Sequence, residues 1–177
     1  MKKEDNSPHK FNSLSDVHRV FGLPDPKHPL ISLINGSVDE PLPCHFPQRH
    51  VLGFYKISYK PKLGGKLRYG QSYYDFDGGG LLFAAPGQIM GAGDEDGTAC
   101  SEYTVLIHPD FLAGHALSRN IRQYGFFSYA ANETLHLSDE ELETIISIFK
   151  MMEKELNSRI DDISQAVVIS QLELLLS

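Results

Sequence analysis

Apolar side chains recur at helical spacing along residues 138–177, and this pattern limits what the chain can fold into more than any other feature. Ser138 and Glu141 have the spacing of a capping box, which predicts that an amphipathic helix begins there. Its expected buried stripe is formed by Leu142, Ile145, Ile146, Phe149, Met152 and Leu156. A turn at Asn157 and Ser158 then leads into a second helix. The sequence therefore predicts a two-helix antiparallel hairpin.

Apolar side chains form an unusually wide stripe on the second helix. One stripe holds Ile160, Ile163, Val167 and Leu174, and Val168, Leu172 and Leu175 lie beside it. A helix with such a wide apolar surface needs more than one packing partner, so we expect it to contact the first helix and something else. No glycine, asparagine or proline stop signal follows Ile163, which predicts either a longer protein or a helix that needs a partner.

The front of the chain has a different pattern, in which short runs of alternating apolar and polar residues are broken by glycine and proline. Strands are predicted at 30–35, 51–60, 66–69, 73–76, 81–85 and 102–108, after a short helix at 13–20. No intervening helix is long enough for a parallel crossover, which favours an antiparallel sandwich or barrel. We therefore expect a mainly β protein with a C-terminal helical part, divided into an arm and connector (1–29), a β body with short helices at its end (30–137) and a helical tail (138–177).

The charge distribution argues against nucleic-acid binding by these residues. The formal net charge is −7, and residues 138–177 hold nine acidic and three basic side chains, so −6 of this charge lies in the tail. Binding to phosphates needs clustered lysine and arginine, which the nearly neutral body does not supply. The two cysteines, Cys44 and Cys100, are too few for a disulfide framework, and no signal peptide or membrane span is present. We expect a soluble, cytoplasmic protein.

The sequence offers little for catalysis or metal binding. His45 and His50 are the best metal candidates among eight histidines, but their spacing fits neither one strand face nor a helix turn. Cys44 beside His45 is adjacency in sequence without a nucleophile motif around it. We therefore expect no catalytic residues, no metal and no cofactor.

Aromatic side chains and one arginine gather on the predicted strands. Tyr55, Tyr59, Arg68 and Phe83 are the candidate lining of a small-molecule pocket, because such pockets are mostly apolar with a few polar groups. The alternative is that these rings only fill the core, since aromatic residues favour strands in any case.

Several segments resemble a known family. HPLISLI at 28–34, FYKISYK at 54–60, YYDFDGGGLLFAAPGQ at 73–88 and ISQAVVISQLELLL at 163–176 resemble AraC-type transcriptional regulators of the kind abundant in Bacteroidetes. The HPDF and NETLHLS parts of HPDFLAGHALSRNIRQYGFFSYAANETLHLSDEE, from residue 108, are the most specific. The resemblance runs from about residue 21 to the end.

The resemblance implies a fold and a function. It implies a cupin-like barrel (a double-stranded β-helix, or jelly roll) over 30–137, helices for dimerisation over 138–177, and a C-terminal helix-turn-helix DNA-binding domain that these residues do not include. The metal-binding HxH motif of cupin enzymes does not occur in the chain, so the barrel is similar to the metal-free regulatory branch.

The expected function is a ligand-sensing and dimerisation domain rather than an enzyme. We expect a homodimer through the second helix, centred on Ile163, Val167 and Leu174, and a small effector such as a sugar or small organic acid. DNA would be bound only through the missing domain, and no membrane is involved. The alternatives are a stand-alone cupin-like isomerase or dioxygenase with ligands from His45, His50 and His108, and a binding module without switching.

Overall fold

The structure is a computed structural model of the 177-residue chain. It describes residues 9–20, 22–35, 49–60, 66–69, 72–75, 80–91, 103–124, 127, 134–158 and 161–177.

A five-stranded antiparallel sheet forms the centre of the molecule, with the strand order β10-β7-β4-β9-β2. Its strands are β2 (Ile31–Asn35), β4 (Tyr55–Lys60), β7 (Gly80–Ala84), β9 (Tyr103–Ile107) and β10 (Thr134–His136). Alternation along β4 places Tyr55, Ile57 and Tyr59 on one face of this sheet, as the period of a strand requires. The prediction of an antiparallel β body is confirmed.

Two smaller sheets accompany the central one. The first has the order β1-β3-β8 and consists of β1 (His9–Phe11), β3 (Arg49–Leu52) and β8 (Ile89–Gly91), with β1 parallel to β3. The second pairs β5 (Lys66–Tyr69) with β6 (Ser72–Asp75). β1, β8 and β10 were not predicted from the sequence, and each is only three residues long.

A two-stranded antiparallel ribbon passes through both of the larger sheets. It is formed by residues 49–60 and 80–91. Arg49 pairs with Gly91 in the small sheet, and Lys60 pairs with Gly80 in the central sheet, so a single register continues across the bend. The bend lies at Gly53, and opposite it the Gly87 N–H donates to the Leu52 carbonyl at 2.9 Å. Gly87 has a φ of 81°, which disfavours other residues there. The predicted strand 51–60 is therefore two strands in two sheets.

The described strands do not close into a barrel. They form three separate sheets, and no hydrogen-bonded pairing joins β2 or β10 to the sheet β1-β3-β8 within the part of the chain that the structure describes. A body with β-sheets followed by two C-terminal helices is thus confirmed, whereas the cupin-like barrel is not.

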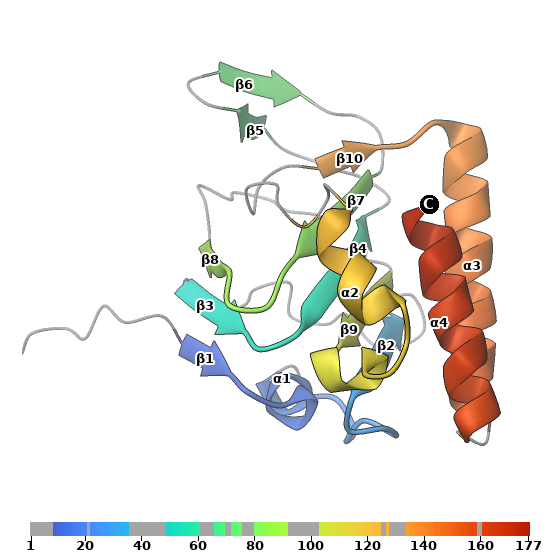
Figure 1. Ribbon diagram of the computed structural model, residues 1–177. Coiled ribbons are helices and arrows are strands. Elements are labelled where there is room, and N and C mark those ends of the chain that lie inside the picture. The colour runs from blue at the N-terminus through green and yellow to red at the C-terminus, as the bar shows by residue number, and fades with distance from the viewer. Residues whose placement is uncertain are drawn as a thin grey trace, which may run out of the picture.

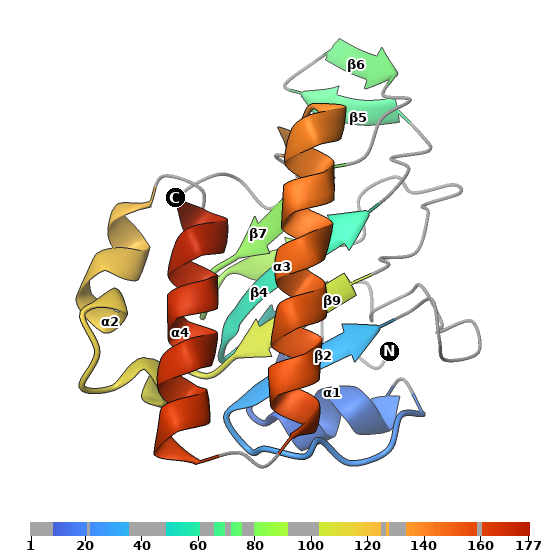
Figure 2. The ribbon, with the colours of Figure 1, turned by 90° about the vertical axis from the view of Figure 1, so that its right-hand side faces the viewer.

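Two long helices cover one face of the central sheet (Figure 1, Figure 2). They are α3 (Asp139–Asn157) and α4 (Asp162–Leu176), and the short connection between them makes them an antiparallel pair. The predicted capping box opens α3: the Ser138 hydroxyl accepts from the Glu141 N–H, and the Ser138 N–H donates to the Glu141 carboxylate at 2.8 Å. The shorter helices are α1 (Leu14–Val20), η1 (Pro109–Leu112), α2 (Leu117–Asn120) and η2 (Ile121–Gln123).

Each face of the central sheet contributes to a separate hydrophobic cluster. The larger cluster joins the sheet to α3 and α4, and in it the rings of Tyr103 and Phe149 stack with their centroids 5.3 Å apart. The smaller cluster lies on the other face and joins Leu106 to Phe11, Leu14 and Leu52, which come from β1, α1 and β3. The residues predicted as an N-terminal arm therefore include part of this second cluster.

Candidate functional site

Local contacts fix how α4 begins and which side it turns to the body. The Asp161 carboxylate accepts from the Ser164 N–H at 2.9 Å and caps the helix. The side-chain amide of Gln165 donates to the Phe111 carbonyl at 2.8 Å, which ties the first turn of α4 to η1. These two contacts fix the start of the helix against the body.

The inner face of α4 belongs to the larger hydrophobic cluster. Its buried apolar side chains are Val168, Ile169, Leu172, Leu175 and Leu176. Leu172 has 0 % of its surface exposed. These residues join α4 to the rest of the larger cluster, which includes residues of α3 and of the central sheet.

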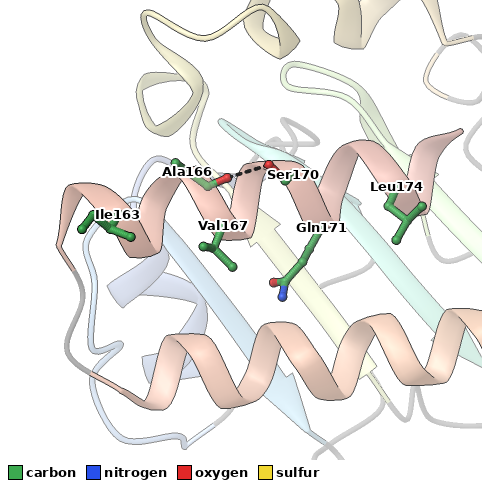
Figure 3. Close-up of a pocket in the computed structure, with 6 residues that line it drawn as sticks. All are labelled: Ile163, Ala166, Val167, Ser170, Gln171 and Leu174. Atoms are coloured by element: carbon green, nitrogen blue, oxygen red, sulfur yellow. Dashed lines mark hydrogen bonds between the residues drawn. The ribbon is translucent and has the colours of Figure 1, made fainter.

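The outer face of α4 is also apolar, and it is exposed. Among the described residues, five large hydrophobic side chains are exposed, and three of them are Ile163 (75 %), Val167 (36 %) and Leu174 (56 %). Together with Ala166, Ser170 and Gln171, they line a shallow open groove of about 380 Å³ (Figure 3). We call these six residues the α4 outer face. None of them is charged, whereas the exposed side of α3 holds Glu140, Glu143, Lys150 and Lys154.

An exposed apolar strip of this kind is unusual for a surface helix. Surface helices of globular proteins normally bury one apolar stripe and expose polar side chains on the opposite side, as α3 does. A contiguous exposed apolar patch in turn marks an interaction site more often than an isolated exposed side chain does. The α4 outer face is therefore the best candidate for a functional surface in the described part of the chain.

Three of the four predicted pocket residues lie in the larger hydrophobic cluster. Tyr55, Tyr59 and Phe83 are 3 %, 4 % and 6 % exposed, and they pack between the central sheet and the helices. The ring of Phe127 contacts Tyr55 and Phe83 edge-on, with centroids 5.1 and 5.4 Å away. Their environment is that of a packed core. Arg68 lies in β5, which belongs to the two-stranded sheet β5-β6 and not to the central sheet. The structure does not describe its side chain.

Some polar side chains share the opposite face of the central sheet with the smaller hydrophobic cluster. The Ser58 and Thr104 hydroxyls face each other across β4 and β9 at 3.3 Å, and Ser58 is 1 % exposed. Nearby in the same sheet, Ser32 on β2 contacts the imidazole of His18 at 2.6 Å. The alternation that puts Tyr55 and Tyr59 on one face also puts Ser58 on the other, so the strand pattern of the sequence indicates both faces.

Two of the three histidines proposed as metal ligands lie in the described part of the chain. His50 lies on β3, and His108 follows β9, where its Nδ1 accepts from the Asp110 N–H at 3.1 Å. His45, Cys44 and Cys100 lie outside the described residues. Within the ranges that the structure describes, no three histidine, cysteine, aspartate or glutamate side chains lie close enough to hold a metal ion.

Among the described residues, the pKa values of two titratable groups are shifted, and neither group belongs to the α4 outer face. The hydrogen bond from the Ser138 N–H lowers the pKa of Glu141, because it stabilises the carboxylate. Partial burial lowers the pKa of His28, whose ring packs edge-on against Phe111. Association through the α4 outer face should therefore depend little on the titration of these groups.

Comparisons with known proteins add no assignment. No protein-family model matches the chain, and a search of the curated proteins finds no match. Among the helices that the structure describes, none is long and apolar enough to cross a membrane.

Proposed function

We propose that this chain is the regulatory domain of an AraC-type transcription factor, which dimerises through α4 and acts through a DNA-binding domain outside these residues. The α4 outer face carries the proposal. Ile163, Val167 and Leu174, chosen from the sequence as the centre of a dimer interface, are among the most exposed large apolar side chains of the described residues. A regulator that binds DNA as a dimer needs such a self-association surface.

The arrangement of the strands supports a cupin-like barrel as the body of this domain. In jelly rolls, strand pairs pass from one sheet to the other at sharp bends. The ribbon that runs from Arg49–Gly91 to Lys60–Gly80 does this at Gly53, and the cluster around Phe11 and Leu106 packs the two sheets together. We therefore propose that the two larger sheets are the walls of such a barrel.

The packing of α4 on the sheet provides a route from effector to dimer. Tyr55, Tyr59 and Phe83 are buried against the same helical layer whose outer face would meet the partner. A small sugar or organic acid that contacted these rings would have to separate the helices from the sheet, and this would move α4. Such a ligand shifts the dimer equilibrium only by the difference between its affinities for the two packing states.

A fusion assay in cells tests the proposed role directly. The chain is fused to a DNA-binding module that recognises its operator only as a dimer, and repression of a reporter is measured. We expect repression by the wild-type fusion and its loss in the variant Val167→Glu/Leu174→Glu. The control Thr144→Glu/Ser147→Glu adds the same charge to the exposed side of α3 and should repress normally. Repression that is absent in the wild type, or equal in both variants, would contradict the proposal.

A calorimetric screen of sugars and small organic acids tests effector binding separately. We expect at least one ligand to bind and to change the dimer dissociation constant. Substitution of Phe83 by alanine should weaken that binding. A ligand that binds without any effect on dimerisation would instead indicate a binding module without switching.

A further inference from the structure

His28 and His108 each precede a proline, and each closes the same local turn. The Nδ1 atom of His28 accepts from the Leu30 N–H at 3.0 Å, and that of His108 accepts from the Asp110 N–H at 3.1 Å. Because proline has no N–H, the first backbone donor after each histidine belongs to the residue beyond the proline. A neutral imidazole whose Nδ1 atom accepts carries its hydrogen on Nε2. Both turns therefore need a histidine that is not protonated at Nδ1.

The two turns lie side by side at one end of the central sheet. The His108 N–H donates to the Leu30 carbonyl at 2.8 Å, just before β2 begins and just after β9 ends. The ring of His28 packs edge-on against the ring of Phe111 in η1, with centroids 5.6 Å apart. The turn at His28 therefore contacts both the start of β2 and η1.

Contacts on both sides of His28 hold the end of the helical pair at which α3 connects to α4. The neighbouring Lys27 donates from Nζ to the Asn157 side chain at 2.7 Å, at the end of α3. The Phe111 carbonyl accepts from the Gln165 side chain at 2.8 Å, in the first turn of α4. Figure 2 shows the loop before β2 beside this end of the two helices. His28 therefore lies between a hydrogen bond to α3 and a hydrogen bond to α4.

Protonation of His28 is incompatible with this arrangement. A protonated imidazole carries hydrogen on both nitrogens, so the Nδ1–H group of His28 would face the Leu30 N–H. Rotation of the ring by half a turn would place a C–H group there, which does not accept either. The protonated ring has to leave its position, and its edge-on contact with Phe111 is lost with it.

His108 makes a matched comparison, because a carboxylate lies beside it. The Asp110 carboxylate is 3.6 Å from its Nδ1 atom, so the protonated ring of His108 gains an ion pair. The His28 side chain differs: within the described residues it forms one hydrogen bond, that with Leu30, and no ion pair. The other charged side chains of the elements that meet here are Asp25 and Lys27 in the loop before β2, Lys154 and Glu155 at the end of α3, and Asp161 and Asp162 at the start of α4.

The energetics of His28 give the latch a sign. Partial burial of the ring lowers the pKa of His28, because it disfavours the charged form. When the turn opens, the ring becomes hydrated and its pKa returns toward the ordinary value of histidine. The open form therefore binds a proton more readily than the closed form, so acid favours opening. The closed form is fully favoured above the ordinary pKa and progressively less as the pH falls through the lowered value.

We propose that His28 is an acid-sensitive latch between the body and the helical pair. The neutral ring keeps the Leu30 turn closed and η1 in place, so that the Phe111 carbonyl can hold Gln165. Protonation opens the turn and releases the first turn of α4 from η1. The buried side chains from Val168 onward stay in the larger cluster, so the release is local. This inference concerns contacts within one chain and does not rest on the proposed function.

Nuclear magnetic resonance of the whole chain between about pH 5.5 and about pH 7.5 tests the latch, since histidines titrate in this range. Three signals are followed: the His28 ring, the Leu30 backbone amide and the Gln165 side-chain amide. We expect all three to shift with the same midpoint, and the two amide protons to lose the downfield shift that a hydrogen bond gives them. Circular dichroism at each pH confirms that the helices remain folded.

Two matched substitutions identify the group responsible. His28→Asn keeps an acceptor for the N–H two residues on, because asparagine also makes this turn, and it cannot be protonated. In this variant the Leu30 and Gln165 signals should not change over the same pH range. His108→Asn alters the neighbouring turn in the same way and should leave the wild-type response of both signals in place.

Three results would contradict the latch. If neither amide signal follows the His28 ring, protonation does not open the turn. If the Leu30 signal follows the ring and the Gln165 signal does not, the turn opens without releasing α4. If His28→Asn keeps the wild-type response, or His108→Asn removes it, another group is responsible. None of these results bears on dimerisation, which sedimentation measures separately.

Discussion

His18 joins two parts of the chain that lie on either side of the proline-rich connector. Its Nδ1 lies 2.7 Å from the Pro24 carbonyl, which can only accept, so Nδ1 carries a hydrogen and donates it. Its Nε2 contacts the Ser32 hydroxyl at 2.6 Å, and both side chains are buried. This pair holds α1 and the connector on β2.

Removal of the Ser32 hydroxyl should therefore destabilise the protein. Ser32→Ala leaves a buried imidazole nitrogen without this partner, and we expect the free energy of unfolding to fall by about 1–3 kcal/mol in a urea titration. The control Ser118→Ala, on the exposed side of α2, should change it by less than about 0.5 kcal/mol. Equal effects of the two substitutions would contradict the structural role of the pair.

The capping box at Ser138 gives a pH dependence with a defined sign. The pKa of Glu141 is lowered in the folded state, so the unfolded chain binds more protons at acidic pH. The stability that this carboxylate contributes is present above its unfolded pKa and is lost as the pH falls through the lowered folded value. Glu141→Gln should therefore reduce the loss of unfolding free energy on going from neutral to acidic pH, as measured by unfolding titrations at several pH values. The control Glu140→Gln, in the same turn, should leave this loss unchanged.

At the scale of elements, α3 and α4 show what the sequence could predict. The capping-box spacing of Ser138 and Glu141 located the start of α3, and the apolar periodicity predicted that α4 is a helix with an unusually wide apolar surface. Both signals are local, because they arise within one helix and its cap.

The strands show what local patterns could not predict. The alternation of apolar and polar residues over 55–60 predicted one strand over 51–60, yet the chain bends at Gly53, and Leu52 and Phe54 on either side of the bend pack in the smaller cluster with Phe11. β1, β8 and β10 are held by partner strands distant in sequence. From the sequence, Tyr55 and Tyr59 were equally compatible with a pocket and with a core. In the structure, the helices cover this face of the sheet and bury both side chains in the larger cluster.

The two sides of α4 should respond very differently to truncation. Leu172→Ala removes a fully buried side chain from the larger cluster and should lower the free energy of unfolding by about 2–5 kcal/mol. Leu174→Ala changes a side chain that is 56 % exposed and should cost less than about 1 kcal/mol in the monomer. Chemical unfolding at low protein concentration measures both. A large loss for Leu174→Ala under these conditions would mean that the outer face is packed within one chain.

At the scale of the whole molecule, charge opposes the association that the α4 outer face favours. Each copy carries a net charge of −7, most of it in the tail, so two copies repel one another. Salt screens this repulsion and leaves an uncharged apolar contact intact. The dimer dissociation constant should therefore decrease as sodium chloride is raised, as measured by sedimentation equilibrium. Dissociation by salt would instead indicate an interface built on ion pairs.

Sedimentation velocity over a wide range of protein concentrations tests most directly whether α4 is a dimer interface. The account predicts a concentration-dependent monomer–dimer equilibrium for the wild-type chain, a folded monomer for Val167→Glu/Leu174→Glu, and wild-type behaviour for Thr144→Glu/Ser147→Glu. A wild-type chain that remains monomeric throughout, or a Val167→Glu/Leu174→Glu variant that associates as strongly as the wild type, would contradict it.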